Sequence, residues 1–122
     1  MPVKILLVDD SRMVQMILPA LWASRWGDRV QVIGALTIEE ARTQFASNSD
    51  LALIVMDARM EKGSKGPDTL DLVREFRKTF EGLIVAHSMD DKYNQPLVEA
   101  GCNRVAEEKF KLDSVLAELG LH

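Results

Sequence analysis

The sequence predicts an α/β fold in which a five-stranded parallel sheet is covered by helices on both faces. Short apolar runs alternate with segments of helical periodicity along the chain, and this alternation is typical of parallel sheets, whose strands are joined by crossover helices. In addition, three of the apolar runs end directly in polar residues, at Asp9, Asp57 and His87. Such residues are expected where strands end at the ligand-binding edge of an open sheet.

The expected strands are short segments rich in Val, Ile and Leu. The first lies between Pro2 and Asp9 and is apolar throughout except for Lys4, which indicates a strand buried on both faces. The last is the weakest, because it is short and partly charged. The five expected strands cover residues 3–8, 30–33, 51–56, 83–86 and 104–107.

The expected helices follow from apolar residues spaced three or four positions apart. Ser11 or Asp10 can cap the first helix, in which Pro19 predicts a kink. Thr37 followed by Glu40 forms a capping-box pattern before the second helix. The helical segments cover about 11–26, 38–45, 70–80, 92–100 and 112–119.

Length and composition are those of a single globular domain, residues 1–122. Hydrophobic residues make up 47% and charged residues 28% of the chain, which excludes a fibrous or disordered protein. The net charge of −4 argues against a nucleic-acid binder that works by bulk positive charge. Cys102 is the only cysteine, so neither an internal disulfide nor a cysteine-based zinc site can form, and we expect it to be buried and inert.

Nothing in the sequence predicts a targeting or membrane segment. The apolar run at residues 3–8 is much shorter than a signal-peptide core or a membrane span. We therefore expect a cytoplasmic protein that does not contact membranes.

Acidic residues follow two of the expected strands, at Asp9-Asp10 and at Asp57. Because these strands end at one edge of the sheet, three carboxylates are expected to converge there with the Ser88 hydroxyl. Carboxylates at this density repel one another unless a cation intervenes, and oxygen ligands favour Mg²⁺. The alternative is that the acids only cap a helix or occupy a turn.

Four segments carry a resemblance to a known family. Their order and spacing resemble the response-regulator receiver domains of two-component signalling, over essentially the whole chain. The segments are Leu-Leu-Val-Asp9-Asp10-Ser11-Arg12, Val-Met-Asp57-Ala-Arg-Met60, Ile-Val-Ala-His-Ser88 and Ala100-Gly101-Cys102.

The resemblance implies a flavodoxin-like (βα)5 fold and a phosphoryl-accepting site. Asp57 would take a phosphoryl group from a phosphohistidine. Asp10 would bind Mg²⁺ directly, Asp9 mostly through water, and the backbone carbonyl of Arg59 would supply a further ligand. Ser88 would then hydrogen-bond the phosphoryl group and bias a switching surface formed by the last two helices and the strand between them.

The sequence departs from the family pattern near its end. Counting without a gap puts Glu108 where the family has a phosphate-pairing lysine, and only a shift of one residue puts Lys109 there; we favour Lys109. The family's aromatic residue on the last strand is replaced by Val105, or by Ala106 in the shifted register. Tyr93 occupies a different position, where we expect it to cap a neighbouring helix.

Several other side chains are expected to be structural. Trp22 is predicted in the core and Trp26 at the surface, as a possible contact point. His87 is expected to be a packed neighbour of the site rather than a catalytic group. A solvated, positively charged helix face is expected from Arg74, Arg77 and Lys78.

The resemblance also implies partners. A sensor histidine kinase or a phosphotransfer protein would donate the phosphoryl group, and a downstream target protein would read the result, without direct contact with nucleic acid. The chain would be a stand-alone receiver, or one excised from a longer protein, and a monomer or weak dimer. It would catalyse only its own phosphorylation and dephosphorylation.

Two alternative functions remain open. The first is a pseudo-receiver, which would bind partners without being phosphorylated. The displaced lysine and the missing aromatic residue suggest it, whereas the intact Asp9, Asp10, Asp57 and Ser88 argue against it. A phosphatase or phosphotransferase that acts on a small substrate through an aspartate nucleophile is less consistent with the sequence, because such enzymes need a second carboxylate as acid/base and a cap domain.

Overall fold

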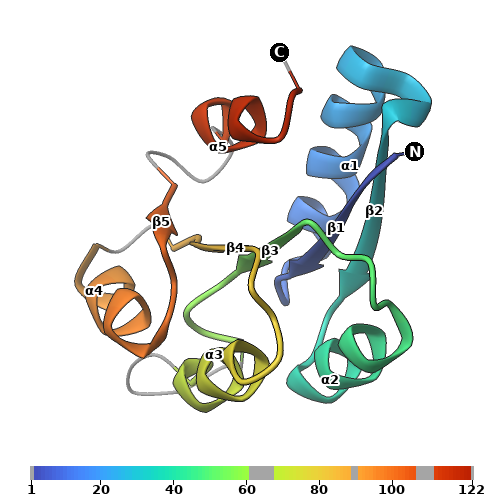
Figure 1. Ribbon diagram of the computed structural model, residues 1–122. Helices are drawn as coiled ribbons and strands as arrows, with labels where there is room; N and C mark the ends of the chain where they lie inside the picture. The colour runs from blue at the N-terminus through green and yellow to red at the C-terminus, as the bar shows by residue number, and fades with distance from the viewer. Residues whose placement is uncertain (1, 61–67, 89–90, 107–111, 122) are drawn as a thin grey trace.

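Strands and helices alternate along the chain in the predicted order (Figure 1). The computed structural model describes residues 2–60, 68–88, 91–106 and 112–121. The first half contains β1 (Val3–Val8), α1 (Arg12–Trp26), the 3₁₀ turn η1 (Gly27–Arg29), β2 (Val30–Ala35) and α2 (Ile38–Ser47). The second half contains β3 (Leu53–Met56), α3 (Leu70–Arg77), β4 (Leu83–Ala86), α4 (Asp91–Ala100), β5 (Arg104–Val105) and α5 (Asp113–Glu118).

The strands form one parallel sheet in the order β2-β1-β3-β4-β5. Val8 pairs with Met56 of β3, Met56 with Ala86 of β4, and Ala86 with Val105 of β5. The strands therefore end side by side, and the residues that follow them meet at one edge of the sheet.

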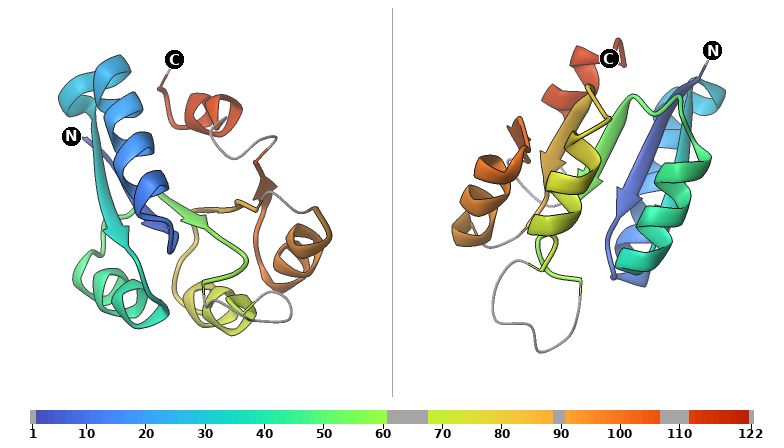
Figure 2. Two further views of the ribbon diagram at one scale, coloured as in Figure 1. Left: turned by 180° about the vertical axis from the view of Figure 1, so that it is seen from behind. Right: turned by 60° about the horizontal axis from the view of Figure 1, so that its bottom comes forward.

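The sheet separates two hydrophobic clusters. On β1, Leu6 and Val8 belong to the cluster shared with α2, α3 and α4, whereas Ile5 and Leu7 belong to the cluster shared with α1 and α5. Successive residues of a strand point to opposite faces, so both faces of the sheet are covered (Figure 2). This arrangement confirms the predicted flavodoxin-like (βα)5 fold.

Both predicted helix caps are present. The Ser11 hydroxyl accepts a hydrogen bond from the backbone N–H of Val14, 3.2 Å away, and the Thr37 hydroxyl accepts one from Glu40, 3.0 Å away. The Glu40 carboxylate reaches back to the N–H of Leu36, one residue before the position that a standard capping box uses.

Several predicted boundaries were wrong by a few residues. β2 extends to Ala35 rather than ending at Ile33, because its pairing with β1 continues to Val8. β3 begins at Leu53, two residues later than predicted, and α4 begins at Asp91, one residue earlier. α3 ends at Arg77, and Phe80 lies beyond it, where its ring packs edge-on against Phe45.

The prediction of an exposed Trp26 was wrong. Only 6% of this residue is exposed, and it belongs to the cluster beneath α1 and α5. The Arg25 guanidinium lies 4.4 Å from the centre of a Trp26 ring. Trp26 follows Trp22 by four residues, so the two lie on the same face of the helix.

The prediction of a solvated face on α3 was wrong for Arg77. Its guanidinium is half-buried and donates hydrogen bonds to the carbonyl oxygens of Phe80, Gly82 and Gly101, at 2.8 to 3.0 Å. Arg77 thereby ties the end of α3 to the residues before β4 and to the turn after α4. Arg74 and Lys78 are exposed, as predicted.

Cys102 is buried, as predicted, and burial raises the pKa of its thiol to about 12. Because the thiolate is the reactive form, a raised pKa lowers the reactivity of this thiol. Within the described residues, no helix combines the length and the apolar character that crossing a membrane requires.

Candidate functional site

The ends of β1 and β3 place the acidic residues beside one another. The backbone N–H of Asp57 donates to the carbonyl of Val8, 2.9 Å away, and the N–H of His87 donates to the carbonyl of Met56, 2.8 Å away. The hydrogen-bonded ladder therefore continues one residue past each strand. The backbone positions of Asp57 and His87 are fixed by the sheet rather than by a loop.

Asp9, Asp10 and Asp57 form the predicted cluster. Each offers a carboxylate oxygen, and these three oxygens lie within 4.8 Å of one another. Asp9 and Asp57 are buried, whereas Asp10 is exposed. A set of carboxylate oxygens at these separations, open to solvent on one side, fits a hard divalent cation such as Mg²⁺.

The Asp9 carboxylate is oriented by neighbours on both sides. Its Oδ1 accepts a hydrogen bond from the backbone N–H of Ser11, 2.9 Å away, and its Oδ2 lies 3.6 Å from Nδ1 of His87. Both side chains are fully buried. His87 is thus a packed neighbour of the cluster, as predicted, and its ring lies beside the buried Asp9 carboxylate.

Comparison with known proteins identifies the fold. No protein-family model matches the sequence, and no curated protein matches it. Solved structures do match over nearly the whole chain. A response regulator receiver protein from Pseudomonas putida is 22% identical, with a TM-score of 0.72 and coverage of 100% of this chain and 98% of that chain.

Two further structures agree. Vibrio cholerae chemotaxis protein CheY4 is 19% identical, with a TM-score of 0.74 and 98% of each chain covered. A response regulator from Burkholderia pseudomallei, solved with a phosphorylated aspartic acid, a calcium ion and citrate, is 17% identical with a TM-score of 0.77; 98% of this chain and 66% of that chain are covered. The chain has the fold of a response-regulator receiver domain.

Two residues that the sequence analysis missed hold the Asp57 segment of this receiver fold. The Thr69 hydroxyl is buried and donates to the carbonyl oxygens of Asp57, at 2.8 Å, and Ala58, at 3.3 Å. The Asp68 carboxylate accepts a hydrogen bond from the N–H of Met60, 2.8 Å away. A threonine before a helical run resembles an N-cap, but the Thr69 side chain makes no cap hydrogen bond to α3.

Replacing Thr69 by valine is expected to lower the free energy of unfolding by about 1–2 kcal/mol, because a buried hydrogen-bonded hydroxyl is removed at nearly constant volume. Urea unfolding followed by circular dichroism measures the change. Thr69→Ser keeps the hydroxyl and is the matched control. A Thr69→Val variant as stable as Thr69→Ser would contradict the role of this hydrogen bond.

Ser88 and Arg59 lie on the segments that flank the cluster. The Ser88 carbonyl accepts a hydrogen bond from the buried Asn94 side chain, 3.3 Å away. The Arg59 guanidinium lies 5.4 Å from the centre of the Tyr93 ring and donates to its hydroxyl at 3.4 Å. Tyr93 lies inside α4 rather than at the end of a helix, and its side chain contacts Arg59. The prediction that Tyr93 caps a helix was therefore wrong.

Part of the predicted site lies outside the described residues. Lys109 and Glu108 both fall there, so the choice between them for the phosphate-pairing position stays a prediction. The predicted role of the Arg59 carbonyl as a metal ligand also remains a prediction. Two residues were candidates for the position of the family's aromatic residue on the last strand. Of these, Val105 is 43% exposed and Ala106 is buried.

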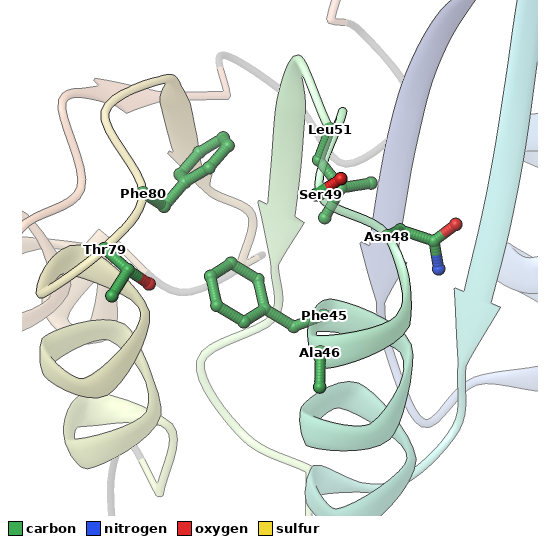
Figure 3. Close-up of a pocket in the computed structure, with 7 residues that line it drawn as sticks. All are labelled: Phe45, Ala46, Asn48, Ser49, Leu51, Thr79 and Phe80. Atoms are coloured by element: carbon green, nitrogen blue, oxygen red, sulfur yellow. The ribbon is translucent and has the colours of Figure 1, made fainter.

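A cavity of about 320 Å³ lies apart from the acidic cluster (Figure 3). It opens between the end of α2 and the segment after α3, near the start of β3, and therefore at the opposite edge of the sheet. Its lining is mainly apolar and carries no charged side chain: Phe45, Ala46, Asn48, Ser49, Leu51, Thr79 and Phe80. This chemistry does not suit a phosphoryl group or a cation.

Proposed function

We propose that the chain is a response-regulator receiver that accepts a phosphoryl group on Asp57. The observation that carries the proposal is the cluster of Asp9, Asp10 and Asp57 at the carboxyl edge of a receiver fold. The similar structure from Burkholderia pseudomallei contains a phosphorylated aspartic acid and a calcium ion, which supports the same chemistry here.

Asp57 is the nucleophile in this proposal. One of its carboxylate oxygens attacks the phosphorus of a phosphohistidine; the new O–P bond forms as the P–N bond breaks, and the electron pair remains on the imidazole nitrogen. Asp9, Asp10 and Asp57 would hold Mg²⁺, which when bound neutralises charge on the phosphoryl oxygens. Thr69 contributes by fixing the backbone from which Asp57 projects.

Ser88 and Lys109 would respond to the phosphoryl group. The Ser88 hydroxyl would hydrogen-bond it, and Lys109 would pair with its charge. A displacement of the Ser88 segment would reach α4, because Asn94 of that helix holds the Ser88 carbonyl. The signal would pass in this way to a surface that includes α4.

The proposed partners are proteins. A sensor histidine kinase or a phosphotransfer protein would donate the phosphoryl group in the cytoplasm, and a target protein would bind the altered surface. The chain would catalyse only its own phosphorylation and dephosphorylation.

The test is to record amide NMR spectra of the chain alone, with Mg²⁺, and with Mg²⁺ and beryllofluoride, which mimics a phosphoryl group on aspartate. We expect Mg²⁺ to shift the amides near Asp10 and Asp57. We expect beryllofluoride to shift amides from Ser88 through α4 and α5. Asp57→Ala is the control and should lose the beryllofluoride response.

Two outcomes would contradict the proposal. Mg²⁺ shifts without a beryllofluoride response would leave a metal-binding pseudo-receiver that acts only by binding partners. The absence of both responses would mean that the acidic cluster is structural, with its carboxylates serving only the helix N-terminus and the turn.

A further inference from the structure

One side chain of α1 contacts the backbone that carries two members of the acidic cluster. Gln15 lies near the start of the helix, and its Nε2 donates to three carbonyl oxygens: those of Leu7 at 2.9 Å, Asp9 at 3.0 Å and Ala35 at 3.1 Å. Because carbonyl oxygens only accept hydrogen bonds, the point on which these three converge requires a donor. The Gln15 amide therefore joins the end of β1 to the end of β2.

The Asp9 carbonyl belongs to the peptide group that links Asp9 to Asp10. On the other side of Asp9, the backbone N–H donates to the Ala35 carbonyl, 3.1 Å away. Both ends of this residue are thereby fixed, the N–H by β2 and the carbonyl by Gln15. A peptide group is planar and turns as a unit, so a rotation that broke the Gln15 hydrogen bond would also move Asp10 relative to Asp57.

Asp10 depends on this backbone for its place in the cluster. Its side chain is exposed and, within the described parts of the chain, accepts no hydrogen bond. Asp9 differs, because it is buried and its Oδ1 accepts a hydrogen bond from the N–H of Ser11. The direction in which Asp10 projects is therefore controlled by the peptide group that Gln15 holds.

We propose that Gln15 is a positioning residue of the metal site. It holds the Asp9–Asp10 peptide so that both carboxylates stay beside Asp57, where a divalent cation would bind. This role rests on the proposed function, because it concerns the cation that the cluster would hold. Replacing a residue that supports metal ligands typically weakens metal binding by about 10- to 100-fold. Gln15 acts on the backbone of a ligand rather than on its carboxylate, so we expect the lower end, about tenfold.

Gly34 of β2 leaves room for the Gln15 amide. A Cβ at position 34 would lie 2.5 Å from Oε1 of Gln15 and 3.2 Å from its Cδ, which is closer than van der Waals contact. The φ angle of Gly34 is not positive, so the backbone itself accepts alanine. Alanine at this position would displace the end of a flexible side chain and leave the strand in place. Gly34→Ala therefore moves the Gln15 amide without removing it.

Mg²⁺ titrations followed by amide NMR test the proposal, with the amides of Asp10 and Asp57 as reporters. Gln15→Met keeps the length of the side chain but removes its donor, and should raise the Mg²⁺ dissociation constant about tenfold. Gln31→Met makes the same change at an exposed glutamine of β2 and should bind Mg²⁺ like the wild type. Urea unfolding of each variant separates the two effects, because a purely structural Gln15 would lower stability without changing the Mg²⁺ affinity of the folded chain.

Gly34→Ala tests the same link from the neighbouring strand. It removes no donor and adds no charge, yet it should weaken Mg²⁺ binding nearly as much as Gln15→Met, because its Cβ displaces the amide. In a Gln15→Ala background the space beside residue 34 is vacant, so Gly34→Ala should cause no further loss. Such non-additivity is expected of residues in contact, and it separates the contact from general effects on β2.

Three outcomes would overturn the proposal. A wild-type chain that does not bind Mg²⁺ would overturn this role of Gln15 and the proposed function together. A wild type that binds Mg²⁺, with Gln15→Met binding it equally tightly, would overturn the role of Gln15 alone and leave the metal site standing. Losses from Gln15→Ala and Gly34→Ala that add in the double variant would show that Gly34 does not act through the Gln15 amide.

Discussion

Asp57→Asn is expected to abolish phosphorylation of the chain. An amide is not a nucleophile toward phosphorus, and Asp57 is the carboxylate that directly follows β3 within the acidic cluster. Incubation with Mg²⁺ and a small phosphoryl donor such as acetyl phosphate, followed by mass spectrometry of the intact protein, measures the result. The wild type should gain the mass of one phosphoryl group, and Asp57→Asn should gain none.

Asp10→Asn is the matched control for this experiment. Asp10 belongs to the same cluster but is exposed and follows β1, so its loss should weaken metal binding without removing the nucleophile. Phosphorylation of Asp10→Asn should be slow and should recover as the Mg²⁺ concentration rises. Asp57→Asn should not recover at any Mg²⁺ concentration. Phosphorylation of Asp57→Asn to the wild-type level would contradict the assignment of the acceptor.

Arg77→Met is expected to destabilise the fold by about 2–4 kcal/mol, because it leaves three backbone carbonyl groups without their donor. Arg77 joins the end of α3 to the residues before β4 and to the turn after α4. Methionine retains the apolar part of the side chain, so the change tests the hydrogen bonds rather than packing. Urea unfolding followed by circular dichroism measures the loss.

Arg74→Met is the matched control, because it makes the same chemical change one turn earlier on α3. Arg74 is exposed, and its ion pair with Asp71 spans 3.3 Å at the surface. Pairs of this kind contribute at most about 0.5 kcal/mol. Equal destabilisation by the two variants would contradict the structural role of Arg77.

Local chemistry allowed much of this fold to be predicted. Ser11 and Thr37 cap their helices because an N-cap depends on a side chain and on backbone groups two or three residues away. The buried strands were predicted because short apolar runs bounded by polar residues have few other structures open to them. The acidic cluster was predicted because parallel strands end at a common edge.

Contacts between distant residues could not be predicted in the same way. Thr69 precedes a helix as a cap would, yet its hydroxyl bonds to the Asp57 carbonyl, which is 12 residues away in sequence. The position of Arg77 on its helix is equally compatible with a solvent-exposed side chain. Its burial depends on the carbonyl groups of Phe80, Gly82 and Gly101, which only the folded chain brings to it. No periodic pattern in the sequence predicts these long-range hydrogen bonds.

The sequence by itself determined the order of strands and helices, the two N-caps and the edge at which the acidic residues meet. Only the tertiary structure decided that Trp26 is buried, that Arg77 is an internal donor and that Thr69 holds the Asp57 segment. The physical reason is that burial and long-range hydrogen bonds depend on which surfaces come together. For each of these side chains, the surface that it contacts belongs to an element distant in the sequence.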